Sequence, residues 1–129
     1  MRLMATRVLT VLLWTIPSSA LQAHHSFAMF DNEHPIELAA TVKELRWVSP
    51  HTILIVEVKS GDAPAKTWTL EGDGPSLLRR QGATSTSLKA GDEIVVKVSP
   101  LHSGAPGGLF RARQITFKDG RLLVPAQLP

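Results

Sequence analysis

The sequence predicts an all-β protein with one short helix, an OB-fold-like antiparallel barrel in the order β-β-β-α-β-β. Three observations carry this prediction. Short segments with alternating apolar and polar residues are separated by turns rich in Gly and Pro. The first segment is long and changes phase, and a single helical stretch lies between the third and fourth segments. A six-stranded barrel of another topology is the alternative, so five or six strands are expected.

Residues 36–48 are the first expected strand, and they contain a change of phase. After Glu44 the apolar positions become Leu45 and Trp47, which is one residue out of step with the earlier alternation. The earlier apolar positions on one face are Ile36, Leu38, Ala40 and Val42. A β-bulge that bends the strand explains such a slip. Ser49-Pro50 then ends the strand.

The next elements are two strands and the helix. Alternating residues predict strands over 52–59 and 66–71, joined by a turn at 61–64. Asp73 or Gly74 is the expected helix cap, Pro75 suits the first helical position and Gly82 suits the end. We expect Leu77 and Leu78 to pack, and Arg79 and Arg80 to face water.

The last elements form the other side of the barrel. Strands are expected over 93–99 and 109–118, with a Pro- and Gly-rich loop at 100–108 between them. Asp119-Gly120 predicts a hairpin that returns as a short final strand over 121–124.

Residues 1–23 have the three zones of a secretory signal peptide. Arg2 and Arg7 are basic, residues 8–16 are apolar, and small residues follow before Ala20 and Ala23, the two expected cleavage sites. The apolar run is too short to span a bilayer, which takes about 20 residues. We therefore expect a periplasmic or secreted protein with no stable membrane anchor after processing, and one barrel domain over residues 24–129.

Removal of this segment changes the charge of the chain. The whole sequence has a formal net charge of +3, but residues 1–23 hold two of its 14 basic residues and none of its 11 acidic ones. The remainder has a net charge of +1 and no basic tract, so nucleic acid is not an expected partner. The chain has no cysteine, which excludes disulfides, thiolate metal sites and a cysteine nucleophile.

Histidines are the informative reactive residues. His51 lies between the first two expected strands and His102 between the last two, in the loops that flank the ligand-binding face of an OB-fold. Cleavage after Ala23 makes His24 the new N-terminus, where its amine and imidazole together chelate a metal, with His25 beside it. Imidazole ligands suit copper or zinc. The plainer interpretation is a solvated histidine pair and a turn-closing histidine after Pro50.

Two further residues lie at the edges of this predicted face. Trp47 ends the first strand and is either a barrel-edge residue or part of a binding loop. Glu71 stands close to Asp73, as a carboxylate pair would, but the step from a strand into a helix cap explains that pair more simply.

Two functions from different classes follow. The first is a non-enzymatic small-ligand or metal-binding barrel that holds copper or zinc through His24, His25 and His51. The second is an accessory module that binds another exported protein, with Trp47, Phe27 and Phe30 as its contact patch. An enzyme is the weakest hypothesis, because no nucleophile has a matched base in the sequence.

Four segments resemble a family of small exported bacterial proteins of unknown function. They are residues 24–31 (HHSFAMFD), 47–51 (WVSPH), 68–71 (WTLE) and 88–92 (LKAGD). The resemblance implies an exported protein with an OB-like barrel and supplies no established activity. Three positions depart from the family pattern: Ser49 replaces an expected Asn, Ala83 an expected Trp, and His102 an expected Arg or Lys. His24, His25 and His51 match the pattern.

Overall fold

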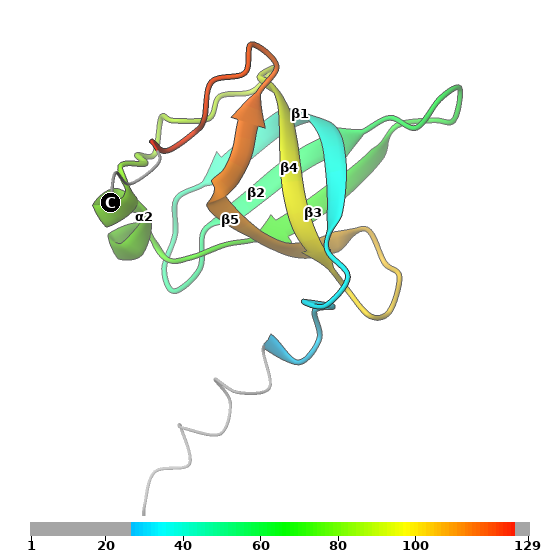
Figure 1. Ribbon diagram of the computed structural model, residues 1–129, viewed down its shortest axis with the longest axis horizontal. Helices are drawn as coiled ribbons and strands as arrows, with labels where there is room; N and C mark the ends of the chain where they lie inside the picture. Colours follow the sequence, from blue (N-terminus) through cyan, green and yellow to red (C-terminus); the bar gives the residue numbers. More distant parts are fainter. Residues whose placement is uncertain (1–26, 126–129) are drawn as a thin grey trace, which may run out of the picture.

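The computed structural model describes residues 27–125, which form a closed five-stranded barrel with one short helix at one end (Figure 1). The elements are β1 (Ile36–Arg46), β2 (Ile53–Val58), β3 (Lys66–Glu71), α2 (Pro75–Gln81), β4 (Glu93–Pro100) and β5 (Gly107–Phe117). This order confirms the predicted OB-like, all-β architecture. Within the described range, no helix has the length and apolar character needed to cross a membrane. The predicted signal peptide lies outside the described residues.

The predicted final strand over 121–124 is wrong. Only one isolated bridge, between Thr116 and Leu122, joins this segment to β5. Val124 instead is 1% exposed, in a cluster with Leu78 of the helix and Ala112 of β5. Because the side chain of Val124 packs in this cluster, the segment does not continue as a strand beside β5. The described residues therefore form the five-stranded barrel, not the six-stranded one.

Closure of the barrel requires one parallel pair of strands. Around the barrel the order is β1-β2-β3-β5-β4, and the last strand pairs with the first. An odd number of strands cannot alternate in direction all the way round, so two neighbours must run the same way. These neighbours are β3 and β5, where Thr69–Glu71 lie beside Gly107–Leu109. The other four pairings are antiparallel, so the barrel is antiparallel except at this contact.

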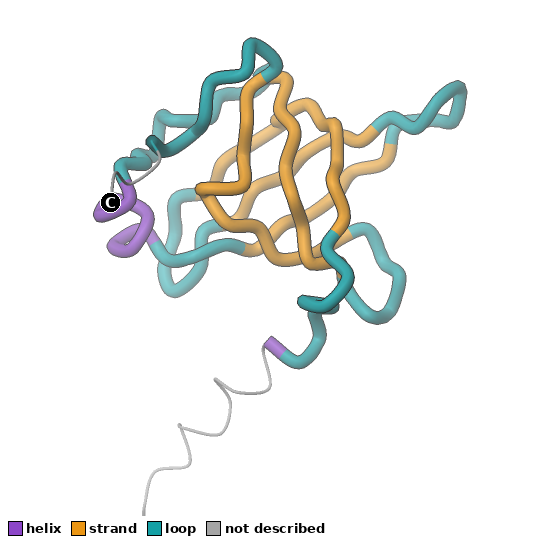
Figure 2. The backbone as a smooth tube through the Cα atoms, in the orientation of Figure 1, coloured by secondary structure: helices purple, strands orange, loops and turns teal. Residues whose placement is uncertain are grey.

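The phase change in β1 is a β-bulge, as predicted. Val42 pairs with Val56 and Glu44 pairs with Ile55, so Lys43 is the extra residue. The bulge switches the inward-facing set from Leu38, Ala40 and Val42 to Leu45, and it bends the strand around the barrel (Figure 2). The strand ends at Arg46, two residues before the predicted end.

Apolar side chains form two clusters. The main cluster fills the barrel, and its fully buried members are Val42, Leu54, Val56, Leu70, Val96, Val98 and Ile115. The second cluster joins α2 to β5 through Leu78, Ala83, Ala112 and Val124, with Trp47 packed against it. In the helix, Gly82 is the left-handed C-cap, as predicted. Leu78 is buried, but Leu77 is 38% exposed, because successive helical residues point in different directions.

We expect Leu54→Ala to lower the free energy of unfolding by about 2–5 kcal/mol, because it removes a fully buried side chain and leaves a cavity. Urea denaturation followed by circular dichroism measures this change. The control is Leu122→Ala, which shortens a side chain that is 45% exposed and should change the free energy by less than about 0.5 kcal/mol. Equal effects of the two substitutions would contradict the assigned core.

Candidate functional site

The segment that precedes β1 is fastened to the beginning of the loop between β4 and β5. We call residues 27–35 the N-terminal segment and residues 101–106 the β4–β5 loop; Figure 1 shows the two side by side below the barrel. Phe30 forms an isolated antiparallel bridge with Leu101 and is 5% exposed. The amide of Asp31 donates to the carbonyl of Pro100 at 2.8 Å, and the amide of His102 donates to the carbonyl of Met29 at 3.0 Å.

A turn closed by Asp31 directs this segment into β1. One carboxylate oxygen of Asp31 accepts hydrogen bonds from the amides of Glu33 and His34, at 3.1 and 3.0 Å. The Nδ1 atom of His34 lies 3.0 Å from the other oxygen. Desolvation of the carboxylate opposes its ionisation, but the hydrogen bonds from His34 and Glu33 and the charge of His34 together outweigh that effect. The pKa of Asp31 consequently lies below its ordinary value of 3.8.

The loop that carries His51, residues 47–52 between β1 and β2, is held against the connection from β3 to α2. The amide of Gly72 donates to the carbonyl of Thr52 at 2.9 Å, and Thr52 is fully buried. A Cβ atom at Gly74 would lie 2.4 Å from the carbonyl oxygen of Pro50, so only glycine fits there. These contacts fix the backbone on both sides of His51.

The imidazole of His51 contacts the carboxylate of Glu71. In the register of β2 and β3, Glu71 lies opposite Ile53. Ile53 follows His51 by two residues, so Glu71 lies close to the loop that carries His51. The Nδ1 atom of His51 and Oε1 of Glu71 form a close pair, with side chains that are 36% and 30% exposed. In the neutral tautomer that carries its proton on Nδ1, this nitrogen would face the carboxylate and the lone pair would be on Nε2. No hydrogen bond to Nε2 is found among residues 27–125. This arrangement leaves one imidazole nitrogen available to a ligand.

Phe27 connects the N-terminal segment with this pair. Its ring and that of His51 meet edge to face, with centroids 6.5 Å apart, and its side chain is 51% exposed. His24 and His25, the other two predicted metal ligands, lie outside the described residues. The described chain therefore begins beside His51, and the two predicted histidines come just before that point in the sequence.

Two hollows border this region. One of about 220 Å³ is lined by Glu71 and Met29, together with Phe30, Ile53, Thr69, Leu101, Pro106, Gly107 and Gly108. The other, of about 420 Å³, has Phe27, His34 and His102 in its wall. His102 is thus in the predicted loop but borders a different hollow from Glu71. Among the residues that the structure describes, no three His, Asp or Glu side chains are grouped closely enough to hold a metal ion.

Trp47 does not belong to the face that His51 and Glu71 share. It packs against the second apolar cluster, and the guanidinium of Arg79 lies 5.9 Å from the centre of its ring. The expected contact patch of Trp47, Phe27 and Phe30 is therefore wrong, because Phe30 is buried and Trp47 packs beside the helix. Of the three, Phe27 alone is an exposed aromatic residue.

Sequence reasoning missed two features of this region. It named Glu71 and His51 as separate candidates and did not pair them. The signal for Glu71 is the alternation of β3: Trp68 and Leu70 point inward, so the side chain of Glu71 points outward. It also overlooked Met29, which shares a hollow with Glu71. The signal for Met29 is its isolation, since no other sulfur-containing residue follows Met4.

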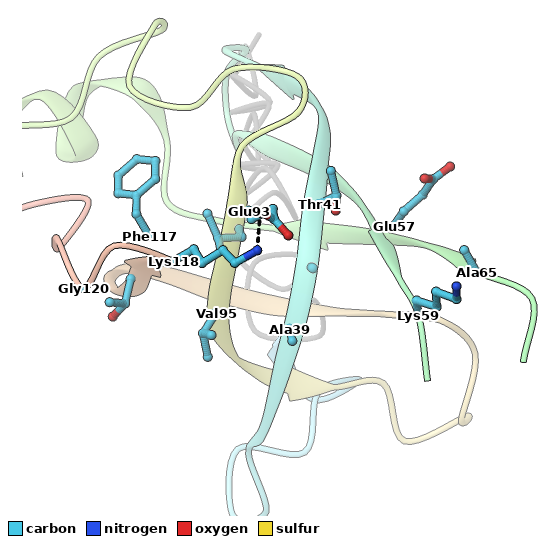
Figure 3. A pocket seen from close by; sticks show the side chains of 13 residues that line it. Ala39, Thr41, Glu57, Lys59, Ala65, Glu93, Val95, Phe117, Lys118 and Gly120 are labelled. Carbon is cyan, nitrogen blue, oxygen red and sulfur yellow. Dashed lines mark hydrogen bonds and ion pairs between the residues drawn. The ribbon is translucent and has the colours of Figure 1, made fainter. Parts of the chain in front are cut away.

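A broad open hollow of about 700 Å³ lies on the outer face of β1 and β4 (Figure 3). Its floor is apolar, with Ala39 and Val95 as neighbours across the two strands. Of its carboxylates, Glu93 pairs with Lys118 at 2.7 Å, as the figure shows, and Glu57 pairs with Lys43 at 3.0 Å. Since these charges are mutually paired and the lining contains no histidine, the face around His51 and Glu71 is the better candidate site.

We expect the side-chain carboxyl of Asp31 to titrate with a midpoint below 3.8, because His34 favours its charged form. A lowered pKa in the folded state means that the turn stabilises the fold above about pH 4, and that this contribution disappears as the pH falls through the lowered pKa. Carbon-detected NMR titration measures the midpoint. In His34→Ala the midpoint should rise towards the ordinary value. An identical midpoint in both proteins would refute the assigned cause.

Comparison with known proteins identifies a family for this chain. Residues 13–112 match the profile of a family of unknown function, DUF6152. Comparisons with curated proteins and with solved structures give no match. The matched stretch covers well over half of the 129 residues and includes both His51 and Glu71. The chain therefore belongs to the DUF6152 family.

Proposed function

We propose that this protein is an exported, non-enzymatic metal-binding barrel, and that it holds copper or zinc through His24, His25 and His51. One observation carries the proposal. The Nδ1 atom of His51 contacts Glu71, and Nε2 has no hydrogen-bond partner within residues 27–125, at the point where the described chain leads back to the two N-terminal histidines.

The pairing of His51 with Glu71 is the arrangement that metal-ligating histidines use. Such a histidine almost always donates its second ring N–H to a carboxylate or carbonyl, which fixes the tautomer and makes the other nitrogen more basic. In this chain the imidazole and the carboxylate come from segments held together by β2–β3 pairing. The ring is therefore oriented before any ligand arrives, which reduces the entropy lost on binding.

Chain connectivity limits how far the other histidines can be from His51. His25 precedes Phe27 by two residues, and two residues of extended chain span at most about 7 Å. Phe27 itself packs against the ring of His51. The covalent chain thus supplies a second imidazole within reach of the first.

Processing after Ala23 would complete the ligand set. The amine and imidazole of an N-terminal His24 form a bidentate chelate, and Nε2 of His51 supplies a third nitrogen. Three nitrogens in this pattern give a T-shaped copper site, and addition of His25 gives the four ligands of a tetrahedral zinc site. The predicted signal peptide sets the compartment as the periplasm or the exterior, where the absence of cysteine leaves histidine as the main ligand type.

We expect the processed protein to bind Cu(II) or Zn(II), and the double variant His24→Ala/His51→Ala to lose binding. Isothermal titration calorimetry measures both, on protein from the periplasm whose N-terminus has been determined by mass spectrometry. His34→Ala is the matched control, because that histidine is 79% exposed and engaged by Asp31 in the turn. Absence of binding above background in the wild type, or equal binding in the double variant, would refute the proposal.

Glu71→Gln tests the orienting carboxylate separately. We expect it to weaken metal binding about 10–100-fold, as removal of an outer-shell partner generally does, while the protein stays folded. Competition with a chromophoric chelator measures the affinity. Glu57→Gln is the control, since Glu57 is another outward-facing strand glutamate with a basic partner. Equal affinities of the two variants would show that Glu71 does not act on the metal site.

A further inference from the structure

The hollow of about 220 Å³ beside β3 has a single ionisable residue, Glu71, in its wall. It lies where the N-terminal segment meets the β4–β5 loop, at the edge of the barrel (Figure 1). The remaining wall residues are uncharged, and most of them have apolar side chains: Met29, Phe30, Ile53, Leu101 and Pro106. The hollow therefore combines one negative charge with an apolar wall, and no lysine or arginine lines it to balance that charge.

The carboxylate of Glu71 is held in place by His51. Its Oε1 atom contacts Nδ1 of the imidazole, and its side chain is 30% exposed. A neutral imidazole that donates from Nδ1 orients the carboxylate and leaves its negative charge in place. Among residues 27–125, the other oxygen, Oε2, has no ion-pair partner. The wall of the hollow thus includes an oriented carboxylate with one oxygen available to a ligand.

An apolar surface lies directly beside this carboxylate. Ile53 is the residue opposite Glu71 in the β2–β3 register, and both line the hollow. Across from them, the backbone of Met29 is fixed, because its carbonyl accepts the amide of His102 at 3.0 Å and Phe30 is bridged to Leu101. The side chain of Met29 is 50% exposed, and a thioether side chain adapts readily to the shape of an apolar ligand.

We propose that this hollow binds a small amphiphilic amine, with its protonated amino group beside Glu71 and a short alkyl chain against the apolar wall. Charge complementarity selects this class of ligand. An ammonium group donates charge-assisted hydrogen bonds to a carboxylate, whereas an alcohol of the same shape carries no charge and a carboxylate is repelled. The inference goes beyond the proposed function, because it requires no metal ion and no residue before Met29.

The test is an NMR titration of metal-free protein with hexylammonium, in the presence of a chelator. We expect the amide signals of Met29, Thr69, Gly107 and Gly108 to shift, because these residues line the hollow. Hexanol should bind at least about fivefold more weakly, since it forms no ion pair, and hexanoate should bind more weakly still. Equal affinities for hexylammonium and hexanol, or shifts confined to other residues, would overturn the inference.

The length of the alkyl chain tests the apolar wall separately. From butylammonium to hexylammonium, affinity should rise about two- to fourfold per methylene, because each added group buries further apolar surface. An affinity that does not change with chain length would show that the ligand touches Glu71 alone, and would overturn the assigned hollow.

Two substitutions locate the site, each with a matched control. Glu71→Gln should weaken hexylammonium binding at least about fivefold, and Glu57→Gln, which changes another outward-facing strand glutamate, should not. Thr69→Phe should fill the hollow and abolish binding, because Thr69 is an exposed member of its wall. Thr67→Phe is its control, since Thr67 is also exposed, lies on the same face of β3 and does not line the hollow. Loss of binding in both phenylalanine variants, or in neither, would contradict the assigned location.

The outcomes distinguish this inference from the proposed metal site. If hexylammonium binds as expected and the processed protein binds neither Cu(II) nor Zn(II), the metal site is refuted and the amine site stands. If metal binds through His24 and His51 but no amine binds, the amine site is refuted and the metal site stands. Should Thr69→Phe melt at a lower temperature than Thr67→Phe, the Glu71→Gln variant and the comparison of hexylammonium with hexanol still decide the result.

Discussion

The parallel contact between β3 and β5 is the interaction on which the rest of the structure depends. It joins only three residue pairs, yet it closes the barrel. Gly107 and Gly108, which lie in this contact, have close neighbours on several sides. A Cβ atom at Gly107 would lie 3.2 Å from the carbonyl oxygen of Thr69 in β3 and 2.9 Å from the side chain of Leu101, and one at Gly108 would lie 2.3 Å from a methyl carbon of Val98 in β4. A larger residue at Gly108 would therefore force β5 away from β4, and one at Gly107 would crowd β3 and displace Leu101.

That closure also builds the candidate site. It sets Glu71, the last residue of β3, beside Leu109 at the beginning of β5, and so brings the β4–β5 loop next to β3. The N-terminal segment is then held on this loop by the Phe30–Leu101 bridge. The site is a consequence of barrel closure, since its parts come from the N-terminal segment, the loop after β1, the end of β3 and the hollow beside the β4–β5 loop.

The strands and the helix are predicted well from the sequence, because the signals that mark them come from residues close together in the chain. The phase change from Val42 to Leu45 predicts the bulge, because residues that face the barrel interior are apolar on both sides of it. Gly74, Pro75 and Gly82 mark the helix because each suits the backbone at its position. These signals depend on neighbouring residues in the chain, so the sequence is enough to find them.

The features that were not predicted depend on contacts between distant residues. Trp47 occurs only four residues before His51, but it packs on the helix, because Leu78 and Ala83 offer an apolar surface there. Residues 121–124 leave the sheet for the same cluster. The pairing of His51 with Glu71 depends on the β2–β3 register, which places Glu71 opposite Ile53. Neither alternation nor composition determines such partners.

The charge near His51 also bears on the proposed metal site. Imidazole and amine are neutral ligands, so a metal ion held by them keeps its full positive charge. Glu71 is held against His51 and its side chain is 30% exposed, so it places one negative charge beside the imidazole. In the proposed site this carboxylate would therefore both orient the ring of His51 and offset part of the charge of a Cu(II) or Zn(II) ion.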